Sequence, residues 1–167
     1  MTQEDKDLIL RDLCARLPYG VYINDRGTPN KLVNVCWDGI KFVVNCSPFG
    51  TGHGRVGTPL FDGDICYIKP YLRPLSSMTE EEARDLAILH GYYEPEILSV
   101  KVTEKYIDVT LDDGVCGTYT ETIWYDEIWI ISSIKCFDYL NKNMFDFRGL
   151  IPKDLALSTE IYNPYKK

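Results

Sequence analysis

The sequence has no hydrophobic run long enough to cross a membrane, no C-x-x-C pair and only two histidines, His53 and His90. Because a transmembrane helix needs about 20 consecutive apolar residues, we expect a soluble protein without membrane contact. Residues 1–7 are acidic where a secretory signal would be basic, which predicts a cytoplasmic protein. No histidine pair has the spacing of a zinc site, so neither a metal nor another cofactor is predicted.

The six cysteines are scattered through predicted helices and strands rather than grouped. In a cytoplasmic protein such thiols stay reduced and pack as small apolar side chains. We therefore expect free, buried thiols and no disulfide at Cys14, Cys36, Cys46, Cys66, Cys116 and Cys136.

The chain also has no excess of basic residues. Eighteen Lys and Arg stand against 25 Asp and Glu, a net charge of -7, and this sign opposes broad attraction to phosphate backbones, so nucleic acid is an unlikely partner. The length of 167 residues and the 45% apolar content are those of one ordinary globular domain. We predict a single domain over residues 1–167.

Two helices are marked by their N-terminal caps. Thr2 with Asp5, and Thr79 with Glu82, have the spacing of a capping box, which predicts helices over residues 3–16 and 80–90, the second ending at Gly91. A third helix is predicted over residues 134–143, with Ile134, Phe137, Leu140 and Met144 facing inward. The apolar stripe expected on the first helix consists of Ile9, Leu10, Leu13, Cys14 and Leu17.

Short runs rich in β-branched and aromatic residues, separated by turn formers, indicate strands. They span residues 21–23, 31–37, 40–46, 65–69, 97–103, 106–111, 117–124 and 127–132. Asp38-Gly39 predicts a hairpin. The sequence therefore predicts an α+β fold of mainly antiparallel sheets, with a small open barrel as one form of the N-terminal half, covered by about three helices.

A glycine-rich stretch at residues 50–57 is the candidate ligand site. Gly52, His53, Gly54 and Arg55 could hold an anion or a nucleotide, because backbone N–H groups approach phosphate closely at glycines. The stretch fits G-x-G-x-x-G, but Thr58-Pro59 follows where a dinucleotide site would open a helix. A surface loop or a partner contact is the favoured interpretation.

Nucleophilic catalysis would need Cys46 or Cys66 beside His53, and sequence gives no geometry for this pair. His90 falls in the last turn of a predicted helix, where a charged imidazole favours the helix dipole. No catalytic residue is assigned, and a non-enzymatic protein is favoured.

The twelve tyrosines suggest a contact surface, because tyrosine is enriched at protein interfaces. The alternative is that most pack at the edge of the core with the hydroxyl in water. The candidate partner contacts are Tyr67, Tyr71, Arg73, Tyr92, Tyr93, Tyr162 and Tyr165.

Four stretches, at residues 13–21 (LCARLPYGV), 69–82 (KPYLRPLSSMTEEE), 138–141 (DYLN) and 145–151 (FDFRGLI), carry a family resemblance. The chain resembles short uncharacterised proteins of gut anaerobic bacteria, their mobile elements and their prophages. The resemblance implies a bacterial or phage origin and carries over no catalytic residues.

Three functions are compatible with these features. The first is a non-enzymatic accessory protein of a phage or mobile element that binds a protein partner through a tyrosine-rich surface. The second is a small-molecule or nucleotide binder that uses the glycine-rich stretch. The third is a structural homo-oligomer, such as a virion component, built through an exposed strand edge.

Overall fold

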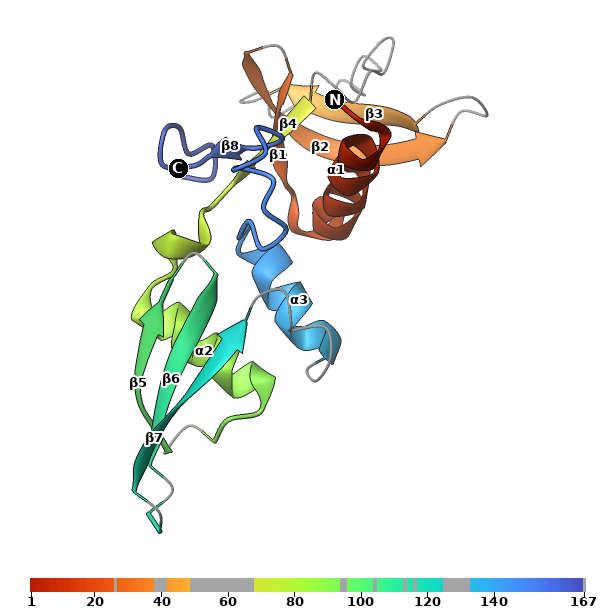
Figure 1. The fold of residues 1–167 in the computed structure, drawn as a ribbon. Coiled ribbons are helices and arrows are strands. Elements are labelled where there is room, and N and C mark those ends of the chain that lie inside the picture. Colours follow the sequence, from red (N-terminus) through yellow and green to blue (C-terminus); the bar gives the residue numbers. More distant parts are fainter. Residues whose placement is uncertain are drawn as a thin grey trace. The chain divides into compact units, whose positions relative to one another are not determined.

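The computed structural model describes residues 1–25, 27–37, 42–48, 68–93, 96–103, 105–112, 114–115, 117–124 and 133–166. The chain divides into two compact units (Figure 1). Unit 1 comprises Met1–Leu72 and Gly149–Lys167, and unit 2 comprises Arg73–Arg148. Unit 2 is thus inserted in the sequence between two segments of unit 1. One domain over residues 1–167 stays a prediction.

Unit 1 begins with helix α1 (Gln3–Arg16), whose predicted bounds are confirmed. The backbone N–H of Asp5 donates to Thr2 Oγ1 at 3.1 Å, and the N–H of Thr2 donates to the Asp5 carboxylate at 2.8 Å. This capping box satisfies N–H groups that have no partner inside the helix. A 3₁₀ turn, η1 (Leu17–Tyr19), follows and ends at Gly20, whose φ of 76° suits glycine.

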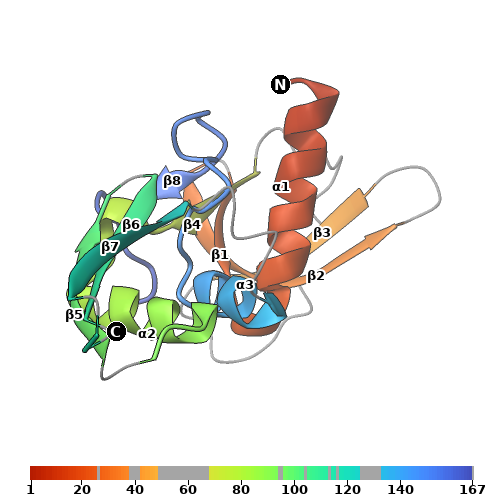
Figure 2. The ribbon, with the colours of Figure 1, turned by 60° about the horizontal axis from the view of Figure 1, so that its bottom comes forward.

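The sheet of unit 1 contains β1 (Tyr22–Asp25), β2 (Thr28–Trp37), β3 (Phe42–Pro48), β4 (Ile68–Leu72) and β8 (Leu157–Ser158). Their order is β3-β2-β1-β4-β8, and α1 lies beside β1 and β2 (Figures 1 and 2). The predicted β2–β3 hairpin is confirmed, because these strands pair antiparallel from Asn30 with Pro48 to Trp37 with Phe42. Only the β4–β8 pair is parallel among the described strands.

Strand β4 ends at Leu72, three residues beyond the predicted end at residue 69, and includes Pro70. Residues 65–67 of the predicted strand lie outside the described residues. Pro70 lies opposite Ile23 of β1, whereas β8 pairs only with Tyr71 and Leu72. In the described residues, Pro70 therefore has a strand on one side only, which is where a strand tolerates a residue without an N–H.

The last segment of the chain, residues 149–166, completes unit 1. The backbone N–H of Thr159 donates to the Leu72 carbonyl at 2.9 Å next to the β4–β8 pair. Leu150, Leu155 and Ala156 are buried. This segment therefore contributes both a strand and core side chains.

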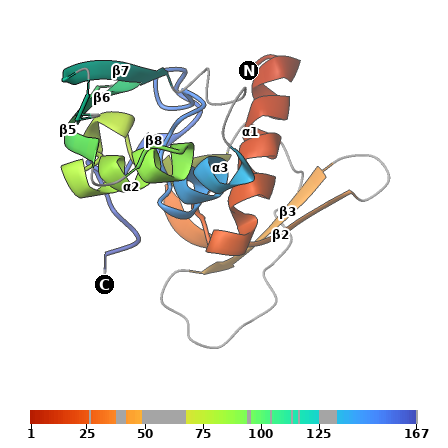
Figure 3. The ribbon, with the colours of Figure 1, turned by 90° about the horizontal axis from the view of Figure 1, so that it is seen from below.

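Unit 2 has a three-stranded antiparallel sheet of β5 (Ile97–Val102), β6 (Tyr106–Asp112) and β7 (Thr118–Trp124), in that order. Helices α2 (Glu80–His90) and α3 (Ser133–Lys142) lie on the same side of this sheet (Figure 3), and a short 3₁₀ turn, η3 (Leu75–Ser77), precedes α2. The core between these layers consists of Leu75, Met78, Ala83, Leu86, Ala87, Ile97, Ile107, Val109, Leu111, Ile123, Cys136, Leu140 and Phe145.

The predicted α+β class with mainly antiparallel sheets is confirmed, and the described strands of unit 1 form an open sheet, not a closed barrel. Helix α2 and the β5–β6 hairpin have the predicted positions. The strand predicted over residues 127–132 lies outside the described residues. No helix in the described ranges combines the length and the apolar character of a membrane span.

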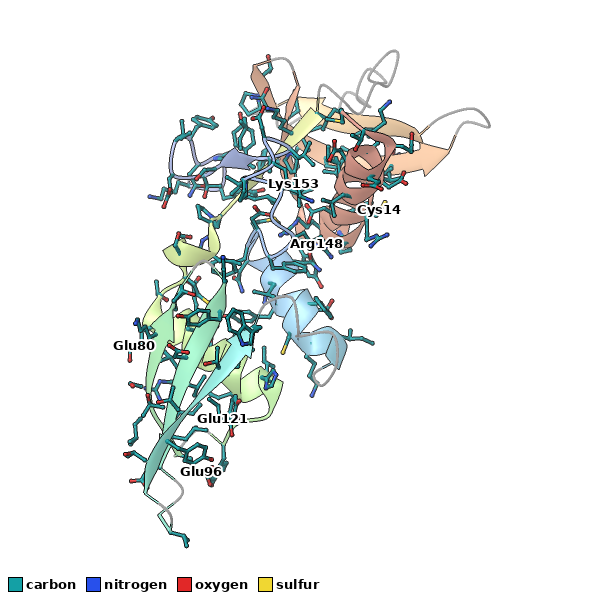
Figure 4. The ribbon with its side chains drawn as sticks, viewed as in Figure 1. Cys14, Glu80, Glu96, Glu121, Arg148 and Lys153 are labelled. Carbon is teal, nitrogen blue, oxygen red and sulfur yellow. The ribbon has the colours of Figure 1, made fainter. Side chains whose placement is uncertain are left out.

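Two side-chain predictions were wrong. Ile134 is 79% exposed, because the buried side of α3 is formed by Cys136 and Leu140. Cys14 on α1 is exposed (Figure 4), whereas Cys136 is buried as predicted. The side chains of the other four cysteines lie outside the described part of the structure.

Candidate binding surface on the three-stranded sheet

The predicted ligand residues Gly52, His53, Gly54 and Arg55, together with Tyr67, lie outside the described residues. Their roles as anion site and partner contact stay predictions. The six remaining candidates, Tyr71, Arg73, Tyr92, Tyr93, Tyr162 and Tyr165, fall in three places.

Tyr71, Tyr162 and Tyr165 lie together in unit 1. The Tyr165 hydroxyl donates to the Tyr71 carbonyl at 3.0 Å and accepts from the backbone N–H of Tyr22 at 3.1 Å. The Tyr165 ring meets the Tyr22 ring edge to face at 5.2 Å between centroids, and Tyr162 packs on Tyr71 at 5.6 Å. These contacts attach the C-terminal segment to β1 and β4. Tyr71 is buried, and Tyr162 stays 44% exposed.

Beside this group, α1 carries a buried ion pair that the sequence reasoning missed. Arg16 Nε donates to Asp12 Oδ2 at 2.8 Å, and both side chains are fully buried. The helical spacing in the sequence indicates this pair, because Asp12 and Arg16 follow Ile9 at i+3 and i+7, on the face that also buries Leu13. Two charges on an apolar helix face must be paired, because an isolated buried charge is very costly.

Arg73 occupies the second place, at the start of unit 2. Its guanidinium donates two hydrogen bonds to Glu82, at 2.6 and 2.9 Å, and a third to the Ser77 carbonyl at 3.0 Å. Its charged carbon lies 4.2 Å from the centre of the Phe145 ring. The hydrogen bonds from Arg73 lower the pKa of Glu82, which also caps α2 through Thr79. The stretch 69–82 therefore encodes a network that fixes the start of α2.

The same network connects the two ends of unit 2. The N–H of Arg73 donates to the Met144 carbonyl at 2.8 Å, and the N–H of Asp146 donates to the Arg73 carbonyl at 2.8 Å. Tyr139 on α3 donates to the Glu82 carbonyl at 3.1 Å. Most of the hydrogen-bonding capacity of Arg73 is thus used within unit 2.

Tyr92 and Tyr93 form the third place, after the C-terminus of α2. The Tyr92 hydroxyl donates to Glu121 on β7 at 2.6 Å, and the His90 ring stacks on the Tyr92 ring at 5.4 Å. Burial lowers the pKa of His90, which favours the neutral imidazole and opposes the predicted interaction with the helix dipole. Burial and the Glu121 carboxylate raise the pKa of Tyr92, so this hydroxyl keeps its proton. Tyr93 is 66% exposed.

The side of the sheet that faces away from α2 and α3 carries a different set of residues. On β6, Ile107, Val109 and Leu111 are buried under the helices. Because strand side chains alternate between faces, Tyr106, Asp108 and Thr110 lie on the opposite face. The register places them opposite Trp124, Thr122 and Thr120 of β7. We call these six residues the Tyr106–Trp124 face.

Interactions within the Tyr106–Trp124 face hold its side chains in place. The Tyr106 and Trp124 rings pack at 4.9 Å between centroids, and Trp124 is 40% exposed. Thr122 donates to Asp108 Oδ1 at 2.8 Å, and the Thr110 and Thr120 hydroxyls are 3.4 Å apart. The sequence reasoning identified these strands but did not select this face, although the alternation of apolar residues along β6 indicates it.

The chemistry of the Tyr106–Trp124 face is that of a contact surface. Its aromatic rings provide apolar area, and its hydroxyl and carboxylate groups can hydrogen-bond a partner. Within the described ranges, no group of three His, Cys, Asp or Glu side chains is arranged to hold a metal ion.

Comparison with known proteins adds no relative. No protein-family model, no curated protein and no solved structure matches this chain.

Proposed function

We propose that this chain is a non-enzymatic accessory protein of a phage or mobile element, and that a protein partner docks on the Tyr106–Trp124 face. The origin rests on the resemblance of four sequence stretches to short proteins of gut anaerobes and their prophages. The aromatic pair formed by the half-buried Tyr106 and the exposed Trp124 carries the functional part of the proposal. Tryptophan and tyrosine dominate the binding energy of many protein interfaces.

The rigidity of this surface supports the proposal. Each strand of the Tyr106–Trp124 face is anchored by residues on its other side, such as Ile107 and Ile123. The face also has its own cross-strand contacts, which restrict the side chains before any partner arrives. A surface that is already ordered loses less conformational entropy on binding.

The other tyrosines of the predicted contact surface support binding less directly. Tyr71 and Tyr165 contact each other within unit 1, and Tyr92 is bonded to Glu121. Tyr93 and Tyr162 are exposed, but neither takes part in a cross-strand aromatic pair. The proposal therefore places the contact on the sheet of unit 2 and not on the tyrosines predicted from the sequence.

A pull-down from a lysate of the host bacterium tests this function. The bait proteins are the wild type, the double variant Tyr106→Thr/Trp124→Thr and the control Tyr93→Thr. Threonine suits a strand, so the double variant keeps the sheet. We expect the wild type and Tyr93→Thr to capture the same partner, and the double variant to capture at least about tenfold less.

Equal capture of the partner by the double variant and by the wild type would contradict the proposed docking face. Light scattering at two protein concentrations separates a heterologous partner from a second copy. A mass that doubles with concentration for the wild type, but not for the double variant, would mean that the face mediates self-association instead.

A further inference from the structure

On the basis of the proposed function, we infer that the Tyr106–Trp124 face recognises an arginine side chain on a basic segment of its protein partner. The guanidinium would stack on the Tyr106–Trp124 pair and donate a hydrogen bond to the Asp108 carboxylate. Three observations support this inference: the arrangement of the face, two similar arrangements elsewhere in unit 2, and the charge of unit 2.

The face combines an aromatic surface with a carboxylate at a suitable spacing. Tyr106 and Asp108 are two residues apart on β6, about 7 Å along the strand and on the same side. Trp124 and Thr122 lie directly opposite them on β7. Thr122 occupies one oxygen of Asp108 at 2.8 Å and so orients the carboxylate. A guanidinium is planar and has donors for the other oxygen while it covers a ring.

A lysine of the same sheet is the register neighbour of Asp108. Lys101 lies opposite Asp108 on β5, yet the structure shows no ion pair between the two among the residues it describes. Both side chains reach solvent, where such a pair contributes little. The carboxylate is therefore available to a cation from a partner.

Unit 2 already holds two of its own arginines in the proposed way. Arg73 lies 4.2 Å above the Phe145 ring and donates to Glu82. Arg148 lies 4.1 Å above the Phe147 ring, with a 3.1 Å hydrogen bond to Asn141. Ring, guanidinium and side-chain oxygen thus recur together in this unit. On the Tyr106–Trp124 face the ring and the oxygen are present, and a partner would supply the guanidinium.

The charge of unit 2 favours a basic partner. Residues 73–148 contain seven Lys and Arg against fifteen Asp and Glu, a net charge of -8, whereas the remaining eleven and ten give unit 1 a net charge of +1. Glu80, Glu96 and Glu121 extend from three different parts of unit 2 (Figure 4). A field of this sign steers a positively charged segment toward the unit and accelerates association.

The inference is tested by NMR titration of the ¹⁵N-labelled full chain with a capped Gly-Arg-Gly peptide. A peptide with citrulline in place of arginine is the neutral control of nearly the same shape. We expect the arginine peptide to shift the indole N–H of Trp124 and the amide signals of Tyr106, Asp108 and Thr122. Loss of a charge-assisted hydrogen bond should weaken citrulline binding about tenfold or more.

Two variants assign the effect to the carboxylate. Asp108→Asn should weaken arginine binding about tenfold, and Glu81→Gln, which removes the same charge from the exposed side of α2, should leave it unchanged. Thermal unfolding of both variants establishes that they are folded. Equal shifts with the citrulline peptide, or unchanged binding by folded Asp108→Asn, would overturn the inference. If the pull-down partner still depends on Tyr106 and Trp124 in that case, the proposed function stands and only arginine recognition fails.

Discussion

Tyr92, Tyr139 and Tyr165 each donate the hydroxyl hydrogen to a defined acceptor in the described part of the structure. Tyr165 donates to the Tyr71 carbonyl, Tyr92 to Glu121 and Tyr139 to the Glu82 carbonyl. Burial is the largest cause that raises the pKa of each hydroxyl above its ordinary value of 10.0. At the scale of the residue, these tyrosines therefore stabilise the fold, whereas the Tyr106 ring packs on Trp124 at the proposed docking face.

Replacing Tyr165 by phenylalanine tests the attachment of the C-terminal segment. The variant removes the donor to the Tyr71 carbonyl and leaves the N–H of Tyr22 without its acceptor. We expect the free energy of unfolding to fall by about 1–3 kcal/mol, measured by urea denaturation. The matched control is Tyr162→Phe, whose exposed hydroxyl should contribute within about 0.5 kcal/mol. Equal effects of the two substitutions would show that the hydroxyl contacts of Tyr165 do not matter.

At the scale of the element, helix α1 shows how a correctly predicted helix can have an unexpected inner face. Its cap and bounds follow from residues within one turn, and both were predicted. The predicted stripe placed Cys14 inside, whereas the structure buries Asp12 and Arg16 and exposes Cys14. Helix α3 differs in the same way at Ile134. Hydrophobicity alone therefore assigned part of each helix to the wrong side.

The Asp12–Arg16 pair gives a prediction for α1. Removing one partner, as in Arg16→Met, leaves a buried charge and should lower the free energy of unfolding by about 3–5 kcal/mol. The double variant Asp12→Leu/Arg16→Met has no buried charge and should recover much of this loss. Urea denaturation of the wild type, both single variants and the double variant measures the coupling energy. Additive losses in the double variant would contradict the pairing.

At the scale of the whole molecule, the two units differ in charge and in the role of their tyrosines. Unit 2 has a net charge of -8 and unit 1 of +1, and unit 2 also carries the Tyr106–Trp124 face. Unit 1 depends on its last segment, since β8 and Tyr165 both come from it. The docking face that we propose therefore lies in the inserted unit.

Tyrosines in both units predict how the stability of the molecule depends on alkaline pH. Tyr92, Tyr139 and Tyr165 keep their protons in the folded state above pH 10.0, whereas the unfolded chain releases them near that value. The unfolded state then binds fewer protons, so the free energy of unfolding falls as pH rises. Below about pH 10 this stabilisation is fully present.

Urea denaturation between about pH 8 and 11 measures this effect. The triple variant Tyr92→Phe/Tyr139→Phe/Tyr165→Phe should lose less stability than the wild type over this range. Its free energy of unfolding at pH 8 should already be lower than that of the wild type, because the three hydrogen bonds are absent. A wild-type stability that stays constant up to about pH 11 would contradict the burial of these hydroxyls.

The sequence by itself determined the elements whose signals lie within a few residues of one another. The capping boxes at Thr2 and Thr79 placed two helices, and the alternation in residues 106–111 placed β6. These signals are reliable because caps and turns are formed by neighbouring groups.

Only the tertiary structure decided which distant parts meet. Tyr22 and Tyr165 are 143 residues apart in sequence and form a hydrogen bond. Likewise, β8 pairs with β4 although all residues of unit 2 separate these strands in the sequence. The Tyr106–Trp124 face likewise depends on which side of the sheet α2 and α3 cover. Spacing along the chain cannot specify these contacts, because they arise from packing between elements whose relative placement no local signal encodes.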